Sequence, residues 1–396
     1  GTGGYKAIPA GGETIAWTVG WALILEYAVA AGAVAVGWSG YINGLLHEMG
    51  MGLPAALMAG PADTITLPDG TTTSGSFNLL AFGISILITW LLVLGTSKSA
   101  KFTSILVVVK VLALSVFIVL AWPHIQHSNF VPMLPNGWGT PLSGVGVLGA
   151  AASIFFAYVG FDAVSTAAEE TKNPNRNIPI GLIGSLAVCT VFYLLVSYAA
   201  IGAMGAQPGG ALSQSKEPLA FVLKEIGYPA VGNAIGIAAV LALPSVVLMM
   251  IFGQTRILFT MARDGLMPKA FAKVHEKYHT PHVVTIVTGI AVSIFAAIFP
   301  VGALADISNS GTLFAFFVVA LGVMVLRKQQ PNRHRPFRTP FLWIVGPLAM
   351  AGCALLFVSL GWLTIKLFLG WFVIGFAVYF LYSRKRSHLA NGTEHS

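Results

Sequence analysis

Residues 153–174 read SIFFAYVGFDAVSTAAEETKNP, a stretch in which apolar, membrane-grade sequence meets acidic residues and a proline. Gly160 weakens helix propensity between bulky aromatic residues, and the side chain of Asp162 can bond nearby backbone amides. We therefore predict that a membrane helix is interrupted near residues 156–160. Irregular backbone survives at membrane depth only where it lines a cavity, and secondary transporters bind their substrates at such interruptions. The stretch thus predicts a transporter with a discontinuous helix.

The acidic end of this stretch predicts where the span leaves the membrane. Glu169 and Glu170 follow the apolar run, and we expect them at its cytoplasmic exit. Asn173 and Pro174 come next. Because the residue before a proline disfavours the helical conformation, we expect the helix to end there.

The composition places this stretch in an integral membrane protein. Of the 396 residues, 56% are hydrophobic and only 9% are charged, and the mean hydropathy is +0.80. Soluble domains carry about 25% charged residues and need a charged exterior. The net charge of +8 comes from short loops between apolar runs, which indicates membrane orientation rather than binding to nucleic acid. Both cysteines lie in apolar runs, which argues against a disulfide scaffold or a zinc cluster.

Ten apolar runs are each long enough, at about 20 residues, to cross a bilayer as a helix. They cover residues 15–45, 77–97, 102–122, 143–168, 178–203, 231–262, 282–304, 306–326, 341–362 and 367–383. Open sheets leave backbone groups unpaired in lipid, and a barrel would show short alternating strands, so we predict an all-α membrane protein. Thr364 to Lys366 are the only residues that separate the last two runs.

We expect a single transmembrane domain over residues 1–396. Its parts are a cytoplasmic start (1–14), a transport core (15–326), two C-terminal helices (327–383) and a cytoplasmic tail (384–396).

Basic residues are divided unequally between alternate loops. One set of loops, with the tail, holds sixteen of them, and the opposite set holds only Lys216, Lys224 and Lys366. The sixteen are Lys98, Lys101, Lys172, Arg176, Arg263, Lys269, Lys273, Lys277, Arg327, Lys328, Arg333, Arg335, Arg338, Arg384, Lys385 and Arg386. Because loops rich in lysine and arginine remain in the cytoplasm, we predict that both termini are cytoplasmic.

Three ionisable residues stand out inside the predicted spans, where charge is costly and usually functional. Burial penalises the charged form of an unpaired amine, so Lys110 is a candidate proton carrier; the alternative is a structural lysine bonded to helix-end carbonyls. Glu26 is a candidate for function or for structural pairing with a neighbouring helix. For Asp162, beside Gly160, we favour a structural role.

Two other motifs indicate structure rather than chemistry. Gly144, Gly146 and Gly149 match G-x-G-x-x-G, but a dinucleotide site needs a preceding strand and a soluble βαβ unit, so we read them as residues for close helix packing. His124 and His127 lie in a loop with no nearby carboxylate or thiol, so we expect no metal site. Because no hydrolase triad, zinc-protease or P-loop pattern is present, we expect no enzyme.

The chain resembles the amino acid–polyamine–organocation superfamily, and within it the bacterial relatives of cationic amino acid transporters. Four segments carry the resemblance: LILEYAVAAGAVAVGWSGY (23–41), FFAYVGFDAVSTAAEETKNPNRNIPIGLIGSL (155–186), GQTRILFTMARDGLMP (253–268) and LADISNSGTLFAFFVV (304–319). It covers most of residues 13–326, and the second segment is highly specific. The resemblance implies a LeuT-like fold of inverted five-helix repeats, usually with twelve spans.

On this resemblance the ten runs correspond to the family's helices three to twelve. The family's first helix carries a glycine-rich break that takes the substrate carboxylate, whereas the GTGG start of this chain has no apolar span around it. We therefore expect a fragment or an N-terminally truncated product that holds half of the pocket. Ala22 also departs from the aspartate that is common in relatives.

The resemblance assigns the interruption to the substrate. Phe156, Ala157 and Val159 would offer backbone carbonyls to the α-ammonium group of an amino acid. Phe161 would be a bulky gate over the pocket.

The resemblance also implies the coupling ion and the side-chain end of the pocket. Lys110 matches a lysine whose ammonium replaces a sodium ion in sodium-coupled members, which implies proton coupling without a metal or another cofactor. Glu26, and Met249 or Met250, would line the side-chain end of the pocket.

We therefore expect a proton-coupled amino acid permease, a multi-pass protein of the plasma (cytoplasmic) membrane that works by alternating access. Its partners would be an amino acid and the lipid bilayer, and not nucleic acid. The alternatives are an exchanger or polyamine carrier on the same fold, and a non-transporting membrane fragment.

Overall fold

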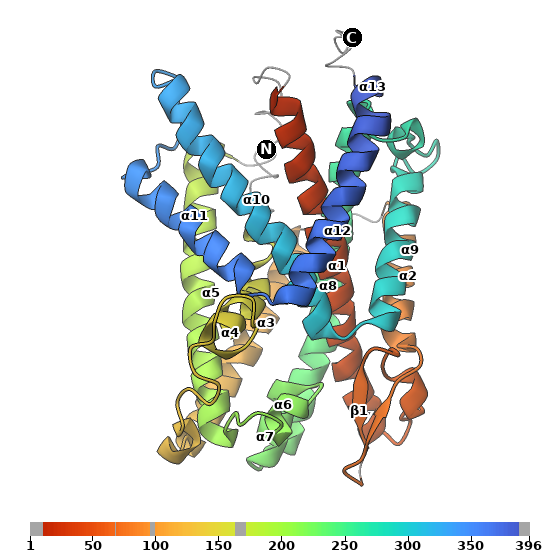
Figure 1. Cartoon of the computed structure of the whole chain (residues 1–396). Coiled ribbons are helices and arrows are strands. Elements are labelled where there is room, and N and C mark those ends of the chain that lie inside the picture. The colour runs from red at the N-terminus through yellow and green to blue at the C-terminus, as the bar shows by residue number, and fades with distance from the viewer. Residues whose placement is uncertain (1–10, 68, 96–99, 163–171, 388–396) are drawn as a thin grey trace.

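The computed structural model describes residues 11–67, 69–95, 100–162 and 172–387, and in these ranges the chain is mostly helical. Figure 1 shows the helices running between two ends of the molecule. Six of the described helices are long and apolar enough to cross a membrane, and four shorter apolar helices accompany them. This confirms the prediction of an all-α chain with about ten apolar helices.

The helices and strands divide into three groups. The six long helices are α1 (Gly11–Glu48), α3 (Ala100–Ala121), α5 (Pro174–Met204), α8 (Pro229–Arg263), α10 (Val301–Gln329) and α12 (Trp362–Val378). The last of them continues through a π-helical turn and one more helical turn to Arg386. The shorter apolar helices are α2 (Leu79–Val93), α4 (Gly146–Ile154), α9 (His282–Ile298) and α11 (Leu342–Val358).

The third group consists of small elements between and beside the long helices. The strands β1 (Thr64–Thr66) and β2 (Thr72–Ser74) form an antiparallel pair. The short helices are α6 (Ala211–Gln214), α7 (Pro218–Glu225) and α13 (Arg384–Arg386). Single 3₁₀ turns cover Ala55–Leu57, Trp122–His124, His127–Phe130, Phe155–Tyr158 and Lys269–Ala272, and a π-helical turn covers Tyr379–Ser383.

Helix α1 is the centre of the bundle and packs between α8 and α10 (Figure 1). Small side chains let helix backbones approach closely in a membrane protein. Where α1 crosses α10, a Cβ atom added at Gly311 would lie 2.6 Å from the carbonyl oxygen of Ala22. One turn along, the Ser308 hydroxyl donates to the carbonyl oxygen of Glu26 at 3.0 Å. This crossing therefore positions Glu26 in the interior.

Two tryptophans join α12 to α1. The indole N–H of Trp21 donates to the carbonyl oxygen of Trp371 at 2.8 Å, and the indole N–H of Trp371 donates back to the carbonyl oxygen of Trp21 at 3.0 Å. The two rings stack with their centroids 4.3 Å apart. Reciprocal bonds of this kind satisfy both indole donors inside an apolar bundle. They hold α12 against α1.

The segment between α5 and α8 is held against the end of α1 by charge. The Lys224 ammonium on α7 lies 2.9 Å from a Glu48 oxygen and 3.2 Å from a Glu217 oxygen. The Glu217 carboxylate sits where a Cβ atom at Gly44 would be, so a larger residue at position 44 would have to displace this carboxylate. Burial raises the pKa of Glu217, and the Lys224 charge opposes that rise.

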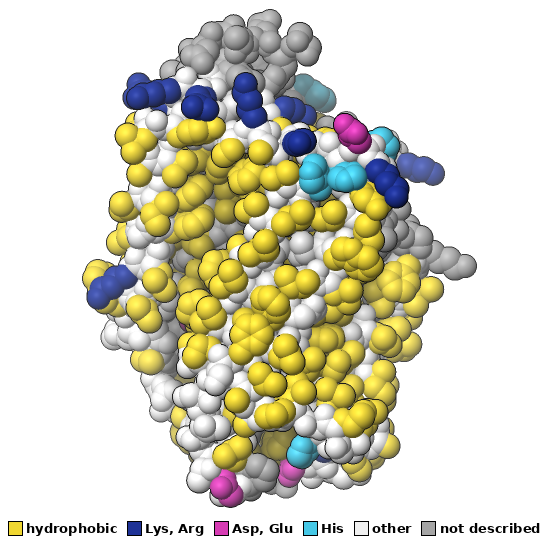
Figure 2. Space-filling view, turned by 90° about the vertical axis from the view of Figure 1, so that its right-hand side faces the viewer, with side chains coloured by type: hydrophobic (Ala, Val, Ile, Leu, Met, Phe, Trp, Pro, Cys, Tyr) yellow, Lys and Arg dark blue, Asp and Glu magenta, His cyan; other side chains and the backbone are white. Residues whose placement is uncertain are grey.

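The two ends of the molecule differ in charge. The described start of α1 and the short helix α13 lie at the same end of the bundle, and the β1–β2 pair lies at the opposite end (Figure 1). Figure 2 shows lysine and arginine side chains along the rim at the first end, above a broad band of apolar side chains. The distribution matches the unequal loop charge predicted from the sequence.

Three predicted boundaries are wrong. The last two runs separate at residues 359–361 rather than at Thr364 to Lys366, because Gly361 turns with a positive φ of 98° and α12 begins at Trp362. The two preceding runs separate at Phe299 and Pro300, because Pro300 is extended and α10 begins at the next residue, Val301. Asp306 therefore lies inside a helix. The run predicted over 143–168 starts as a helix only at Gly146.

Asn173 and Pro174 have a different role from the one predicted. Asn173 takes a left-handed conformation with φ of 48°, and Pro174 is the first residue of α5, where a missing N–H costs nothing. Helix α5 thus begins four residues before the predicted run. The predicted exit residues Glu169 and Glu170, Lys98, and much of the expected cytoplasmic start and tail lie outside the described residues.

Candidate functional site

The predicted helix interruption is present, and it follows α4 directly. Helix α4 ends at Ile154, and the chain tightens into the 3₁₀ turn Phe155–Tyr158. Val159 is extended (φ −61°, ψ 131°), and Gly160 has φ of 108°, which side chains rarely tolerate. The prediction of an interruption near residues 156–160 is therefore confirmed.

Neighbouring helices hold the carbonyl groups that the interruption releases. The last carbonyls of a helix have no partner within it. Asn309, fully buried on α10, donates its amide N–H groups to the carbonyl oxygens of Ala152 at 3.0 Å and Ser153 at 2.8 Å. The Tyr193 hydroxyl on α5 donates to the carbonyl oxygen of Ala157 at 2.5 Å. Two helices thus fix the backbone on either side of Phe155.

The carbonyl groups of Phe156, Ala157 and Val159, proposed for the substrate ammonium, follow one another along this turn. They differ in whether they already accept a hydrogen bond. The Phe156 carbonyl accepts the N–H of Val159 at 3.0 Å, and that of Ala157 accepts from Tyr193. No described residue donates to the carbonyl of Val159. Each carbonyl oxygen accepts two bonds, so all three retain capacity for a ligand.

Two acidic residues and a tyrosine from separate parts of the chain meet beside the interruption. Glu26 on α1 is fully buried, and neither carboxyl oxygen has a hydrogen-bond partner among the described residues. The adjacent Tyr27 hydroxyl donates to a carboxylate oxygen of Asp162 at 3.3 Å. The nearby Thr312 hydroxyl is already bonded to the Ser308 carbonyl at 3.1 Å. A buried carboxyl group without a partner is costly, so Glu26 is a candidate ligand-binding or proton-binding group.

The predicted gate residue, Phe161, lies on the edge of this site. Its ring meets the ring of Phe316 on α10 at 5.4 Å and 69°, and Phe155 meets the same ring at 6.1 Å and 75°. Edge-to-face pairs of this kind are stabilising. A single ring on α10 therefore contacts both sides of the interruption, and Phe161 is only half-buried.

Of the two methionines that were considered together, Met250 lies at the interruption. It is 6% exposed, and a Cβ atom added at Gly160 would be 3.0 Å from its terminal methyl. Met249 is 50% exposed and points elsewhere. Neighbouring positions on a helix face about 100° apart, so only one of them can reach the site.

Lys110 stands apart from the acidic residues. It is half-buried on α3, which packs against α5 and α8. Within the described part of the chain, its ammonium forms no ion pair and no hydrogen bond. The structure thus places an unpaired amine in a membrane helix but does not join it to Glu26 or Asp162.

The sequence analysis missed the polar cluster on α10. Asn309 and its neighbours Ser308, Ser310 and Thr312 are all fully buried in the middle of an apolar helix. Asp306, one turn before Asn309, lines a cavity of about 450 Å³ between α10 and the turn that joins α11 to α12. A run of polar residues inside a membrane span was the signal that could have identified them.

Known proteins that are similar to this chain are transporters. A profile of the family described as "Amino acid permease" matches residues 1–383. The chain is 44% identical to the branched-chain amino acid permease BcaP of Bacillus subtilis (strain 168) over 378 residues, which cover 96% of this chain and 78% of that protein.

Two further relatives have other substrates in their names. The methylthioribose transporter of Bacillus subtilis (strain 168) is 41% identical over 379 residues, which cover 96% of this chain and 78% of the relative. The vacuolar cationic amino acid transporter 2 of Arabidopsis thaliana is 32% identical over 328 residues, which cover 82% of this chain and 49% of the relative.

Proposed function

This chain belongs to the amino acid permease family, whose members are transporters and not enzymes, and from that premise we propose that it imports neutral, branched-chain amino acids in symport with protons. The interruption after α4 would bind the substrate. Its backbone carbonyls would accept the α-ammonium group, and the observation that carries this assignment is the fixed, irregular backbone between Phe155 and Gly160 inside a membrane bundle.

Apolar groups around the interruption support a branched-chain substrate. Val159 and Met250 adjoin the turn, and the rings of Phe161 and Phe316 close one side of it. A branched side chain gains about 25 cal/mol for each Å² that it buries against such groups. The relative with 44% identity bears a branched-chain name.

A cationic amino acid is the second candidate, and Glu26 favours it. Its buried, unpartnered carboxylate beside the interruption would pair with a cationic side chain at the far end of the substrate. The cationic transporters of Arabidopsis thaliana are among the relatives. Exchange or polyamine transport on the same fold remains an alternative mode of the same site.

Uptake into proteoliposomes separates these substrates. Radiolabelled leucine would be imported under an inward proton gradient, and excess unlabelled leucine, isoleucine or valine would compete. Import of radiolabelled lysine without import of leucine would support a cationic substrate, and import of methylthioribose alone would refute amino acid transport by this chain.

Lys110 is our proposed proton carrier. A half-buried amine with no ionic partner can change its protonation state as the site fills and empties. Lys110→Ala and Lys110→Arg should both abolish uptake driven by a pH gradient, because a guanidinium group does not release its proton in this range. Lys366→Ala is the matched control, since that lysine lies on α12 beside the Trp362 ring. Unchanged gradient-driven uptake in Lys110→Arg would overturn the assignment.

We further propose that the charged end of the bundle in Figure 2 faces the cytoplasm of a plasma membrane, so that both termini are cytoplasmic. The unequal loop charge supports this orientation. Cysteine labelling with a membrane-impermeant reagent tests it: in whole cells, a cysteine at Thr73 on β2 would react and one at Arg333 would not. The reverse result would invert the topology.

A further inference from the structure

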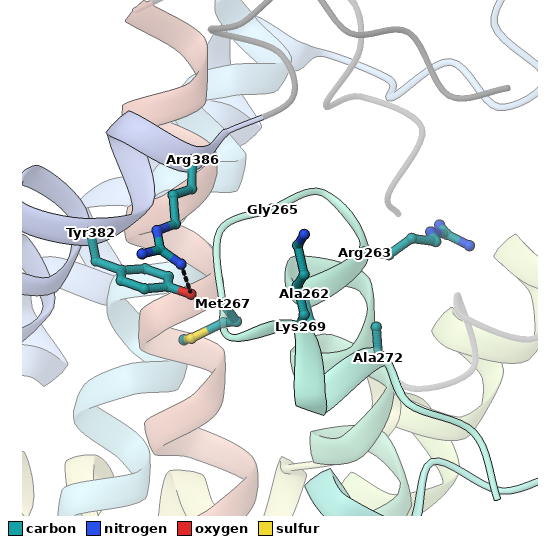
Figure 3. A pocket seen from close by; sticks show the side chains of 8 residues that line it. All are labelled: Ala262, Arg263, Gly265, Met267, Lys269, Ala272, Tyr382 and Arg386. Atoms are coloured by element: carbon teal, nitrogen blue, oxygen red, sulfur yellow. Dashed lines mark hydrogen bonds between the residues drawn. The ribbon is translucent and has the colours of Figure 1, made fainter.

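A cavity of about 320 Å³ lies at the charged end of the bundle, away from the interruption (Figure 3). It is bounded by the end of α8 with the loop that follows, and by the end of the C-terminal helix. Three cationic side chains line it, from Arg263, Lys269 and Arg386. Ala262 and Met267 add apolar surface, and the described residues contribute no carboxylate to its lining.

No carboxylate of the described residues neutralises the cationic groups here. None of the three forms an ion pair with a carboxylate in the described ranges. Asp264 follows Arg263 in the chain but is not part of the lining. Like charges placed around one cavity repel each other unless an anion enters it. The arrangement therefore favours a negatively charged occupant.

A π-helical turn gives the cavity a fixed wall. The turn Tyr379–Ser383 is held to the loop by the buried Ser383 hydroxyl, which donates to the carbonyl oxygen of Leu266. π-Helical turns of this kind occur frequently at functional sites. Here the turn precedes Arg386, whose guanidinium carbon lies 4.5 Å from the centre of the Tyr382 ring. One guanidinium N–H points to the Tyr382 hydroxyl at 3.4 Å (Figure 3).

The cavity also lies at the end of the bundle that carries the cationic rim. Figure 2 shows lysine and arginine side chains along this rim, above a broad band of apolar side chains. Charge is costly inside the hydrocarbon core of a bilayer, so the cationic side chains that line the cavity belong beside the lipid headgroups, above the apolar band.

We propose that this cavity binds a phosphate group, carried either by an anionic phospholipid of the same leaflet or by inorganic phosphate. The planar fork of Arg386 would take two phosphate oxygens, and Lys269 would add a point charge. The Tyr382 hydroxyl, once freed from Arg386, would donate to the same group. An occupied cavity would tie the C-terminal helix to the loop after α8.

Equilibrium binding with the purified full chain tests the proposal. A fluorescent phosphatidylglycerol in detergent micelles is the probe, and it is displaced by unlabelled phosphatidylglycerol, phosphatidylcholine or inorganic phosphate. Displacement by phosphatidylglycerol alone would assign the site to a lipid, and displacement by millimolar phosphate as well would assign it to the phosphate group in either form.

Charge-matched variants separate the cavity from general surface charge. The double change Lys269→Gln with Arg386→Gln should weaken binding at least tenfold, at roughly a few-fold for each lost charge near a headgroup. Lys328→Gln with Arg333→Gln removes the same charge from another loop at this end and should change the dissociation constant less than twofold. Equal weakening in the two double variants, equal displacement by phosphatidylcholine, or no saturable binding would overturn the proposal.

Discussion

Replacing Asn309 tests whether the interruption is a preorganised binding site. Its side-chain amide reaches from α10 to two carbonyl oxygens in the last turn of α4, and it is fully buried. Asn309→Ala removes both donors while it leaves the surrounding apolar residues in place. The proposed substrate carbonyls lie three to seven residues further along the same backbone.

The expected cost follows from the number of bonds lost. A buried hydrogen bond contributes about 1 kcal/mol net, and a carbonyl left without a partner costs about 1–3 kcal/mol. Two such carbonyls give a loss of about 2–6 kcal/mol in the free energy of unfolding. We assign roughly 1.4 kcal/mol of this free energy to returning the backbone to its binding conformation. The apparent affinity for substrate then falls about tenfold.

Leucine uptake into proteoliposomes measures the KM, and the melting temperature of the purified protein measures the stability. Asn129→Ala is the matched control, because the Asn129 amide donates to the Gly202 carbonyl oxygen at 2.6 Å, remote from the interruption. We expect both variants to melt earlier and only Asn309→Ala to raise the KM. An unchanged KM in Asn309→Ala, with the same loss of stability as the control, would refute the reasoning.

Two further predictions concern a gate and an ion pair. Phe161→Ala removes one half-buried ring and should impair transport more than folding; an equal loss of melting temperature and activity would instead indicate core packing. Lys224→Gln leaves the Glu217 carboxylate without its cation and should lower stability by roughly 1–2 kcal/mol at pH 7.5. Burial raises the pKa of Glu217, so the folded protein binds a proton on this carboxyl group more tightly than the unfolded chain does. The stability that this proton contributes is present at low pH and is lost as the pH rises. The penalty in Lys224→Gln should therefore shrink when melting is measured near pH 4.5, and a penalty independent of pH would contradict the assignment.

The sequence by itself determined the class of protein and the place of the interruption. Apolar runs long enough for a bilayer leave helices as the available structure, because backbone groups in lipid must pair within their own segment. The interruption was predictable because Gly160 is a local signal, and the conformation it permits is a property of one residue. Helix boundaries were less predictable. Pro174 begins a helix rather than ending one, and Gly361 forms the turn that precedes α12.

Only the tertiary structure decided which groups complete the site. Asn309 lies more than 150 residues from the carbonyls that it bonds, and Tyr193 reaches Ala157 from another helix. The choice of Met250 over Met249 depends on how α8 is rotated, and the exclusion of Lys110 from the acidic group depends on where α3 packs. In a bilayer, apolar patterning gives little information about which helix face meets protein and which meets lipid, since both surroundings are apolar. Helix rotation and pairing are therefore set by small residues and buried hydrogen bonds between distant segments, and those contacts exist only in the folded chain.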